Sequence, residues 1–238
     1  MKNPLVLKLQ QYDALTPEEI SVIERIVPRP HVFAAGTDIV VEQSRPPGSS
    51  LIIDGFASRY KVNDRGQRNI TALHFTGDFV DLHALLLRKM DHSVGAITDC
   101  KVAIIDHGAL REVTQDYPHL TRLLWLGTLV DAAIHRQWLA IARNSALKRA
   151  AHLMCEMLFR GRPVGLSGEN SFRLPITQSD LGDALGLSTV HTNRTLQELR
   201  ALGLLSWVKE TVSVHDVPAL IALAEFDPTY LSQRTEPR

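Results

Sequence analysis

Residues 174–199 read LPITQSDLGDALGLSTVHTNRTLQEL, and this stretch decides the fold of the C-terminal part of the chain. Thr177 has the side chain and the position to cap a first helix, and Gly186 permits a tight turn after that helix. Ser188 can cap a second helix in the same way. The stretch therefore predicts two short helices joined by a turn, which is the helix-turn-helix motif.

The apolar spacing gives each of these helices an inner face. For the first helix that face is predicted to be Leu181, Ala184 and Leu185, and for the second it is Thr192, Leu196 and Leu199. An ordinary surface hairpin of helices is the alternative interpretation. The glycine in the turn, the two caps and the polar outer face agree with one another, and this agreement favours the helix-turn-helix.

The outer face of the second helix carries mostly short or hydrogen-bonding side chains: Thr189, Val190, His191, Asn193, Arg194 and Gln197. Such side chains read base edges in the major groove of DNA. Arg194 could pair with guanine, and Asn193 or Gln197 with adenine. The methyl groups of Thr189 and Val190 could meet a thymine methyl, whereas Ser188 and His191 are better placed for phosphate. Thr177 and Gln178, at the start of the first helix, complete the candidate DNA-binding set.

A β-hairpin is predicted downstream, with strands at 206–209 and 211–214 around Glu210, so the unit is a winged helix-turn-helix. The net charge of this C-terminal part argues against strong DNA binding. From Arg149 to the C-terminus there are nine Lys or Arg residues and ten Asp or Glu residues, a net charge of −1. Because phosphate attraction dominates affinity for DNA, such a domain should bind non-specific DNA weakly and depend on a dimer to double its contacts.

The N-terminal half has a different texture. A helix is expected after Thr16, with Pro17 at its first position and Glu19 completing a capping box. Short β-rich runs separated by turn residues then follow, at 32–33, 38–41, 50–53, 57–62, 69–74 and 101–105. Many closely spaced strands without helices between them are typical of a β-sandwich or jelly roll rather than of βαβ units.

After Pro118 the apolar period becomes helical, and one long helix is predicted over 118–143. Its stripe consists of Leu120, Leu123, Leu124, Gly127, Val130, Ile134, Trp138 and Ile141. The stripe is interpreted as a dimer seam, with an intramolecular core helix as the alternative. The polar residues 143–145 predict a hinge, and a further helix is expected over 146–159.

Composition excludes several classes of protein. The chain has 238 residues, 45% of them hydrophobic, and 26 basic residues balance 26 acidic ones, as in an ordinary globular protein. Cys100 and Cys155 belong to no metal-binding spacing, so we expect no metal site and a reducing, cytoplasmic location. We also expect no signal peptide and no membrane segment. No catalytic motif is found, and the densest polar group (Asp78, Asp81, His83, Asp91 and His92) fits no metal hydrolase, so we expect no enzyme.

A β-roll, a long helix and a winged helix-turn-helix in this order resemble the Crp/Fnr superfamily of bacterial transcription regulators. The resemblance covers about residues 15 to 220 and rests on 33–55, on Gly77-Asp78-Phe79-Val80 and on 176–205. It implies an α+β protein with a cyclic-nucleotide-binding-like sensor domain over 1–117, a dimerisation helix over 118–143, a winged helix-turn-helix domain over 145–220 and a tail over 221–238. It also implies a homodimer, a palindromic operator in double-stranded DNA and contact with RNA polymerase.

The resemblance further implies that residues 189, 190 and 194 are the chief base readers, with 193 used in the oxygen-responsive branch. Arg194 keeps the family's arginine, whereas Val190 replaces the Glu of well-known branches, so their half-site sequences should not be transferred.

The sensor departs from the cyclic-nucleotide-binding pattern. Where that pattern has Gly-Glu-Leu and then Arg-Ser or Arg-Thr, this chain has Asp81-Leu82-His83 and Asp91-His92-Ser93. Leu82 cannot accept a hydrogen bond from a ribose, and His92 is a poorer phosphate fork than Arg. Cyclic AMP bound in the family's usual way is therefore not expected. The iron–sulfur branch is not expected either, because its N-terminal cysteine cluster is missing.

Three alternatives remain open for the sensor. Haem could be held by His74, His83 or His92 with Cys100. Another small anion could be held by Arg88, His92 and Ser93 beside a short helix beginning near Asp81. The third alternative is a scaffold without a ligand. The candidate effector residues are therefore Asp81, Leu82, His83, Arg88, His92 and Ser93.

The leading hypothesis is a homodimeric, sequence-specific DNA-binding transcription regulator whose β-roll acts on a hinge near Asn144. The alternative is a small-molecule-sensing module that acts through protein partners rather than DNA. The nearly neutral C-terminal domain is the observation that supports this alternative.

Overall fold

The computed structural model describes residues 3–87 and 89–233. The chain divides into two compact units. Of the described residues, 3–61, 71–87, 89–132 and 233 belong to unit 1, and Val62–Ile70 and Ala133–Ser232 belong to unit 2. Each unit is described below by itself. In the described part of the chain, no helix is both long and apolar enough to cross a membrane.

Two sheets form the centre of unit 1, and the strands whose register is defined pair antiparallel. The first sheet has the order β1-β7-β3 and contains β1 (His31–Phe33), β7 (Cys100–Asp106) and β3 (Gly48–Asp54). The second has the order β2-β6-β4-β5 and contains β2 (Asp38–Val40), β6 (Ser93–Ala96), β4 (Phe56–Val62) and β5 (Arg68–Phe75). The predicted β-roll is confirmed. Only β6 was missed, and it is a four-residue strand that contains Gly95.

Helices flank the sheets of unit 1. In α2 (Pro17–Ile26), the predicted capping box between Thr16 and Glu19 is present in both directions. Sequence reasoning missed α1 (Pro4–Gln10) and α3 (His107–Asp116). The 3₁₀-helix η1 (Leu82–Leu85) begins one residue after Asp81, where a short helix was expected.

The long helix α4 runs from Pro118 to Ala140 and so ends three residues before the predicted boundary at 143. Assigning the start of its apolar stripe to a dimer seam is wrong. Leu120, Leu123 and Leu124 are all less than 10% exposed in the single chain, so they belong to its own core, as the alternative interpretation held. The apolar side chains that α4 leaves exposed are Trp125, Leu129 and Leu139, which lie on a different stripe.

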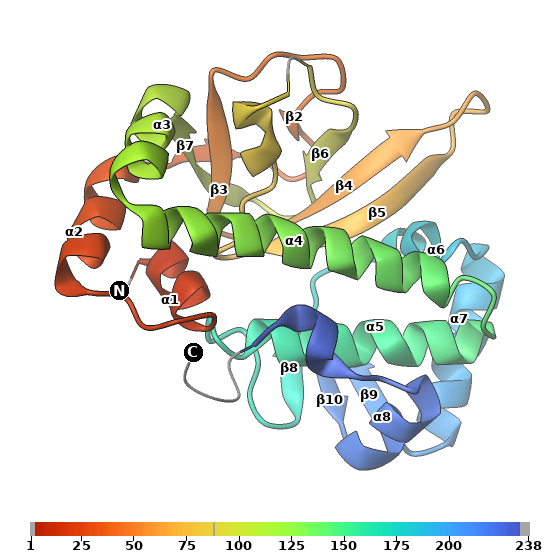
Figure 1. Ribbon diagram of the computed structural model, residues 1–238. Helices are drawn as coiled ribbons and strands as arrows, with labels where there is room; N and C mark the ends of the chain where they lie inside the picture. Colours follow the sequence, from red (N-terminus) through yellow and green to blue (C-terminus); the bar gives the residue numbers. More distant parts are fainter. Residues whose placement is uncertain (1–2, 88, 234–238) are drawn as a thin grey trace. The chain divides into compact units, whose positions relative to one another are not determined.

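Unit 2 contains a three-stranded sheet and the helices that follow the predicted hinge. The helix α5 (Ala146–Gly161) begins at Ser145, whose side chain caps it as expected. The sheet has the order β8-β10-β9, and its strands are β8 (Ser171–Arg173), β10 (Thr211–Val214) and β9 (Leu205–Val208). Figure 1 shows this sheet beside α8 (Val217–Ala224), and α8 packs on α5.

The residues predicted as a tail, 221–238, are partly structured. They include the second half of α8 and the 3₁₀-helix η2 (Pro228–Leu231). Phe226 and Leu231 are buried there, so the compact part of unit 2 extends beyond the predicted boundary at 220. Residues 234–238 of the predicted tail lie outside the described residues.

Candidate nucleic-acid interface

The first helix of the predicted motif is α6 (Gln178–Leu185), and its N-terminus is capped as expected. The Thr177 hydroxyl accepts a hydrogen bond from the backbone N–H of Asp180 at 3.1 Å, and the Asp180 carboxylate accepts one from the backbone N–H of Thr177 at 2.9 Å. Burial acts to raise the pKa of Asp180, but the hydroxyl and backbone N–H of Thr177, which both donate to its carboxylate, and Arg68 hold it below its ordinary value. Gly186 ends the helix in the left-handed conformation, with φ of 63°, so the predicted turn is confirmed.

Gly182, which sequence reasoning did not single out, sets the distance between the two helices. A Cβ atom at this position would lie 2.7 Å from the backbone oxygen of Leu187 and 3.1 Å from Oγ1 of Thr192. Only glycine therefore permits this approach of α6 to the turn and to the second helix. A signal was present in the sequence, because a glycine inside a helix usually marks close packing.

The second helix of the motif is α7 (Thr189–Ala201), and it divides into two faces as predicted. The Ser188 hydroxyl caps it by accepting the backbone N–H of His191 at 3.3 Å. Thr192, Leu196 and Leu199 form the buried face, each no more than 1% exposed. Thr195 is also buried, which sequence reasoning missed, and its hydroxyl donates to the backbone oxygen of His191 at 2.9 Å.

The other face of α7 is open to solvent. All six residues predicted for it are exposed: Thr189, Val190, His191, Asn193, Arg194 and Gln197. Asn193 donates to the side-chain oxygen of Gln178 at 3.2 Å, which brings a predicted residue of α6 next to this face. The α7 face, meaning these six side chains, is thus a polar surface carried on a rigid and well-packed base.

The predicted wing is the hairpin of β9 and β10, in which Val208 pairs with Thr211. At its tip Lys209 has a positive φ of 54°, a conformation typical of a tight turn. The hairpin is extended by β8, a strand that the sequence analysis did not predict. Arg173 of β8 donates to the Glu210 carboxylate at 2.9 Å across the tip.

One contact of α6 involves a residue distant in sequence. Arg68, at the start of β5, donates through Nε to the Asp183 carboxylate at 2.9 Å and is also paired with Asp180. Residues 62–70 group with unit 2, and these carboxylates raise the pKa of Arg68 against the effect of burial. Nothing local in the sequence indicated this pairing, because the partners are more than 100 residues apart.

The described candidate effector residues of unit 1 have different surroundings. Asp81 is fully buried and accepts hydrogen bonds from the backbone N–H and the hydroxyl of Ser50, and burial raises its pKa to about 6 despite these bonds. Ser93 accepts the backbone N–H of Glu42 at 3.0 Å. Asp81 and Ser93 therefore have protein partners of their own. Leu82 is half-buried in η1, and Arg88 lies outside the described residues.

The structure does bring His83 and His92 together. Their ring centroids are 5.2 Å apart, and Nδ1 of His92 lies 2.7 Å from a carboxylate oxygen of Asp91. Burial, and secondarily the positive charge of Arg59, lower the pKa of His92 to about 4 and also lower that of His83. We call these three residues, His83, Asp91 and His92, the histidine cluster. The sequence analysis grouped these residues as polar and as effector candidates, but it did not predict which of their side chains would meet.

The cysteine proposed as a haem ligand is poorly suited to that role. Cys100 is completely buried in the apolar core of the β-roll, where its thiol donates to the backbone oxygen of Phe56 at 3.1 Å. Burial raises the pKa of this thiol, which disfavours the thiolate that would bind iron. His74, the other distant candidate, is also buried and lies 4.0 Å from Asp78.

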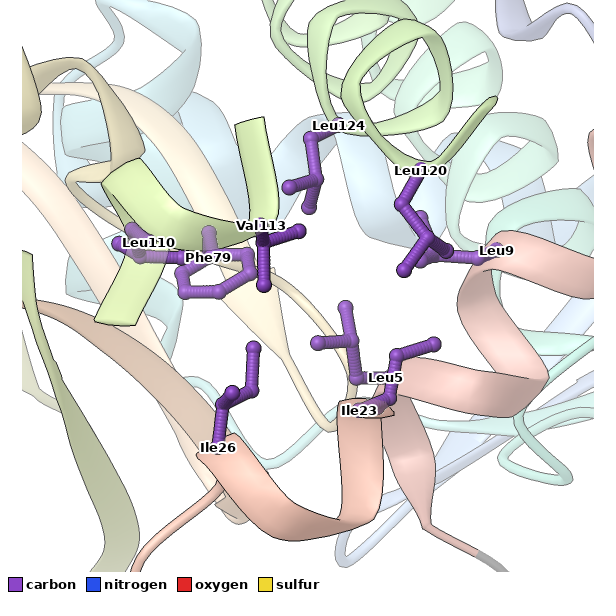
Figure 2. A pocket seen from close by; sticks show the side chains of 9 residues that line it. All are labelled: Leu5, Leu9, Ile23, Ile26, Phe79, Leu110, Val113, Leu120 and Leu124. Atoms are coloured by element: carbon purple, nitrogen blue, oxygen red, sulfur yellow. The ribbon is translucent and has the colours of Figure 1, made fainter. Parts of the chain in front are cut away.

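A pocket in unit 1 is lined by hydrocarbon side chains from α1, α2, α3, α4 and Phe79. Figure 2 shows the nine side chains: Leu5, Leu9, Ile23, Ile26, Phe79, Leu110, Val113, Leu120 and Leu124. Because these side chains offer no hydrogen-bonding group, the pocket does not match a nucleotide or another small anion.

A two-domain architecture of this kind, with an antiparallel β-roll and a winged helix-turn-helix, defines a class of DNA-binding regulators. Comparison with known families agrees with it. Residues 30–117 match the cyclic nucleotide-binding domain and residues 148–223 match the Crp-like helix-turn-helix domain. The chain belongs to the Crp/Fnr superfamily of transcription regulators.

Curated relatives cover almost the whole chain. The transcriptional activator protein anr of Pseudomonas aeruginosa is 27% identical over 93% of this chain and 89% of its own length. The transcriptional activator FnrL of Cereibacter sphaeroides is 25% identical over 88% of this chain and 86% of its own. Among solved structures, FixK2 from Bradyrhizobium japonicum has a TM-score of 0.73 at 22% identity, covering 82% of this chain and 96% of that one. The similarity to FixK2 supports a shared fold.

Proposed function

We propose that the chain is a sequence-specific transcription regulator that binds a palindromic operator as a homodimer, with the α7 face in the major groove. The observation that carries the proposal is the exposure of all six side chains of that face on a helix whose opposite side is tightly packed. Arg194, Asn193 and Gln197 offer the donors and acceptors that distinguish base pairs in the major groove. Val190, 74% exposed, offers a methyl contact to thymine.

Phosphate contacts would come from the edges of the motif. Ser188 and His191 at the N-terminus of α7, and Thr177 and Gln178 at that of α6, occupy positions from which helix N-termini meet phosphates. Because the net charge from Arg149 onward is −1, affinity from phosphates alone would be low. Two copies of the motif on two half-sites would compensate for this weakness.

The homodimer is supported by the exposed stripe on α4. Trp125, Leu129 and Leu139 are 65%, 46% and 75% exposed and are separated by 4 and 10 residues, which fits a heptad repeat. We propose that this stripe, rather than the one predicted from the sequence, pairs the two copies. Sedimentation velocity tests it. Leu129→Lys should shift the protein toward monomer, whereas Leu86→Lys, at an 86% exposed leucine of unit 1, should not.

The remaining parts of the proposal concern control. Unit 1 would act on DNA binding through the residues around Asn144, which lie in a turn between α4 and α5, and bound dimers would contact RNA polymerase in the cytoplasm. Haem, an anionic effector, or a scaffold role without ligand remain hypotheses for unit 1.

Selection of bound sequences from a random DNA pool tests the function directly. We expect a two-fold symmetric site with half-sites about one helical turn apart. Arg194→Ala should then lose about 1 to 3 kcal/mol of discrimination at one base pair while remaining folded. Arg162→Ala, which removes an exposed arginine of the same unit at the end of α5, is the matched control and should keep full discrimination.

A pool from which no sequence is enriched would contradict the proposal. It would favour the alternative of a sensing module that acts through protein partners, which the nearly neutral C-terminal domain supports.

A further inference from the structure

The histidine cluster of unit 1 has the composition of a metal site. His83 comes from η1, while Asp91 and His92 directly precede β6, so two segments of the chain meet there. Each residue offers one ligand atom, and these three atoms lie within 4.8 Å of one another. A tetrahedral ion with bonds of about 2.1 Å holds its ligand atoms about 3.4 Å apart. Small side-chain rotations would therefore close the cluster around an ion.

The two imidazoles have unused nitrogen atoms. Nε2 of His83 and Nε2 of His92 are both buried, and neither has a hydrogen-bond partner among the residues that the structure describes. His92 is only 7% exposed, so solvent has little access to its ring. A buried polar atom without a partner is unfavourable, and two such atoms on neighbouring rings are matched by one cation placed between them.

The second nitrogen of His92 already has the partner that metal-bound histidines have. Its Nδ1 lies 2.7 Å from the Asp91 carboxylate, an arrangement that leaves Nε2 as the coordinating atom and fixes the orientation of the ring. Asp91 is the exposed member of the three and can also turn an oxygen toward the ion. In the empty cluster Asp91 therefore orients the ring of His92, and on ion binding it turns away from Nδ1 to serve as the third ligand.

The surrounding charges favour a cation over an anion. Among the described residues, Arg59 is the positive charge that acts on both imidazoles, and its guanidinium is held by Asp131 through two hydrogen bonds of 2.8 and 3.3 Å. Asp131 neutralises Arg59, and both imidazoles are neutral. The net charge at the cluster is therefore the negative charge of Asp91. An anionic effector would face that carboxylate, whereas a cation would neutralise it.

We propose that His83, Asp91 and His92 bind a divalent transition-metal ion, with Zn²⁺ as the reference ion. Imidazole nitrogen suits Zn²⁺, Co²⁺, Ni²⁺ and Fe²⁺, whereas Mg²⁺ and Ca²⁺ prefer oxygen ligands. Three protein ligands leave a coordination position open for water or a small molecule. The proposal concerns unit 1 alone and does not depend on whether the chain binds DNA.

The test uses the full-length protein, purified without a histidine tag and freed of metal with a chelator. Co²⁺ is titrated and followed by its visible absorption, and Zn²⁺ is titrated by calorimetry. We expect one equivalent of either ion to bind with a rise in thermal midpoint, and no such response to Mg²⁺. The paired substitution His83→Ala with His92→Ala should weaken binding by more than about 100-fold, and Asp91→Asn by about 10- to 100-fold.

The matched control removes two histidines outside the cluster. His31 in β1 and His215 after β10 are both exposed, so His31→Ala with His215→Ala should leave the tight equivalent unchanged. Loss of binding in this control, or the absence of a tight equivalent in the wild-type protein, would overturn the proposal.

Two further measurements keep the test decisive. If the paired cluster variant does not fold, His83→Gln at the half-buried position replaces it and should still abolish the Co²⁺ absorption. Inorganic phosphate is titrated in parallel, without metal. Phosphate binding that is lost in the cluster variants but kept in the control would assign the cluster to an anion and overturn the proposal.

Discussion

The α7 face and the histidine cluster are both candidate binding sites, yet they stand in opposite environments. On α7 the functional side chains are exposed, and the helix below them is packed by Thr192, Leu196 and Leu199. In the histidine cluster His92 is buried, contacts the carboxylate of the adjacent Asp91 and lies beside the ring of His83 from η1. Substitutions on the α7 face should therefore change binding without changing folding, whereas substitutions around the cluster should change both. The predictions below test this difference.

The largest effect is expected beside the cluster. Asp131→Ala removes the partner of the buried Arg59 and should cost about 3 kcal/mol of unfolding free energy, the low end for a buried ion pair because Asp131 is partly exposed. Urea unfolding measures this loss. Glu42→Ala breaks the more exposed pair with Lys61 in the same unit and should cost less than about 1 kcal/mol. If both variants lost the same unfolding free energy, the contacts around the cluster would contribute no more to stability than an exposed ion pair does.

The second prediction tests the packing of α6 that positions the α7 face. Gly182→Ala places a Cβ atom 2.7 Å from the backbone oxygen of Leu187, so α6 must move, at a cost of about 1 to 3 kcal/mol. Gly168→Ala is the control in the same unit, because its Cβ would meet only Ser171 at an ordinary 3.5 Å. We expect Gly182→Ala to weaken operator binding as well, since α7 is positioned through this contact. A variant that unfolds more easily but binds normally would show that the spacing of the helices is unimportant.

The sequence predicted the α7 face well because the relevant physics is local. Helical periodicity alone separates Thr192 and Leu196 from the outward residues, and the caps at Thr177 and Ser188 are side-chain to backbone contacts within three residues. The histidine cluster could not be predicted in this way. His83 lies in η1 and His92 comes nine residues later, just before β6, and only the folding of the β-roll places their rings 5.2 Å apart.

Other features were predicted only in part or were missed, and each has a physical reason. The stripe on α4 was correctly recognised as apolar, but periodicity does not tell whether an apolar stripe meets the same chain or a second copy. The strand β6 has only four residues and contains Gly95, so it lacked the length and composition of a strand signal. The Arg68 contacts with Asp180 and Asp183 join residues far apart in sequence, and no local pattern encodes them.

A smaller effect concerns pH and the interior of unit 2. His152 is buried in α5, between Phe226 and Tyr230, and burial lowers its pKa although Glu156 acts to raise it. The unfolded chain therefore takes up a proton near pH 6.5 while the folded chain does not, and stability is lost as the pH falls below that value. We expect a slope of at most about 1.4 kcal/mol per pH unit from this group.

His152→Gln should remove this contribution, so that the unfolding free energy of the variant falls less steeply than that of the wild type between pH 6.5 and pH 5. The comparison is made by urea unfolding at a series of pH values, with a probe in unit 2 such as Trp207. Parallel pH profiles for the two proteins would show that His152 does not distinguish the folded from the unfolded state.

The smallest change in unfolding free energy is expected at Val190. A substitution there also tests most directly whether the α7 face binds DNA independently of folding. Its side chain is 74% exposed, so Val190→Glu should change the unfolding free energy by less than about 0.5 kcal/mol. Its effect on DNA should be large, because a carboxylate accepts a hydrogen bond from the amino group of cytosine, whereas valine can only contact a thymine methyl. Selection from a random pool should therefore return a changed base at one symmetric position of each half-site, with the remainder of the site retained. An unchanged site would mean that residue 190 does not face a base, and a marked loss of stability would mean that the α7 face is not the independent surface that its exposure indicates.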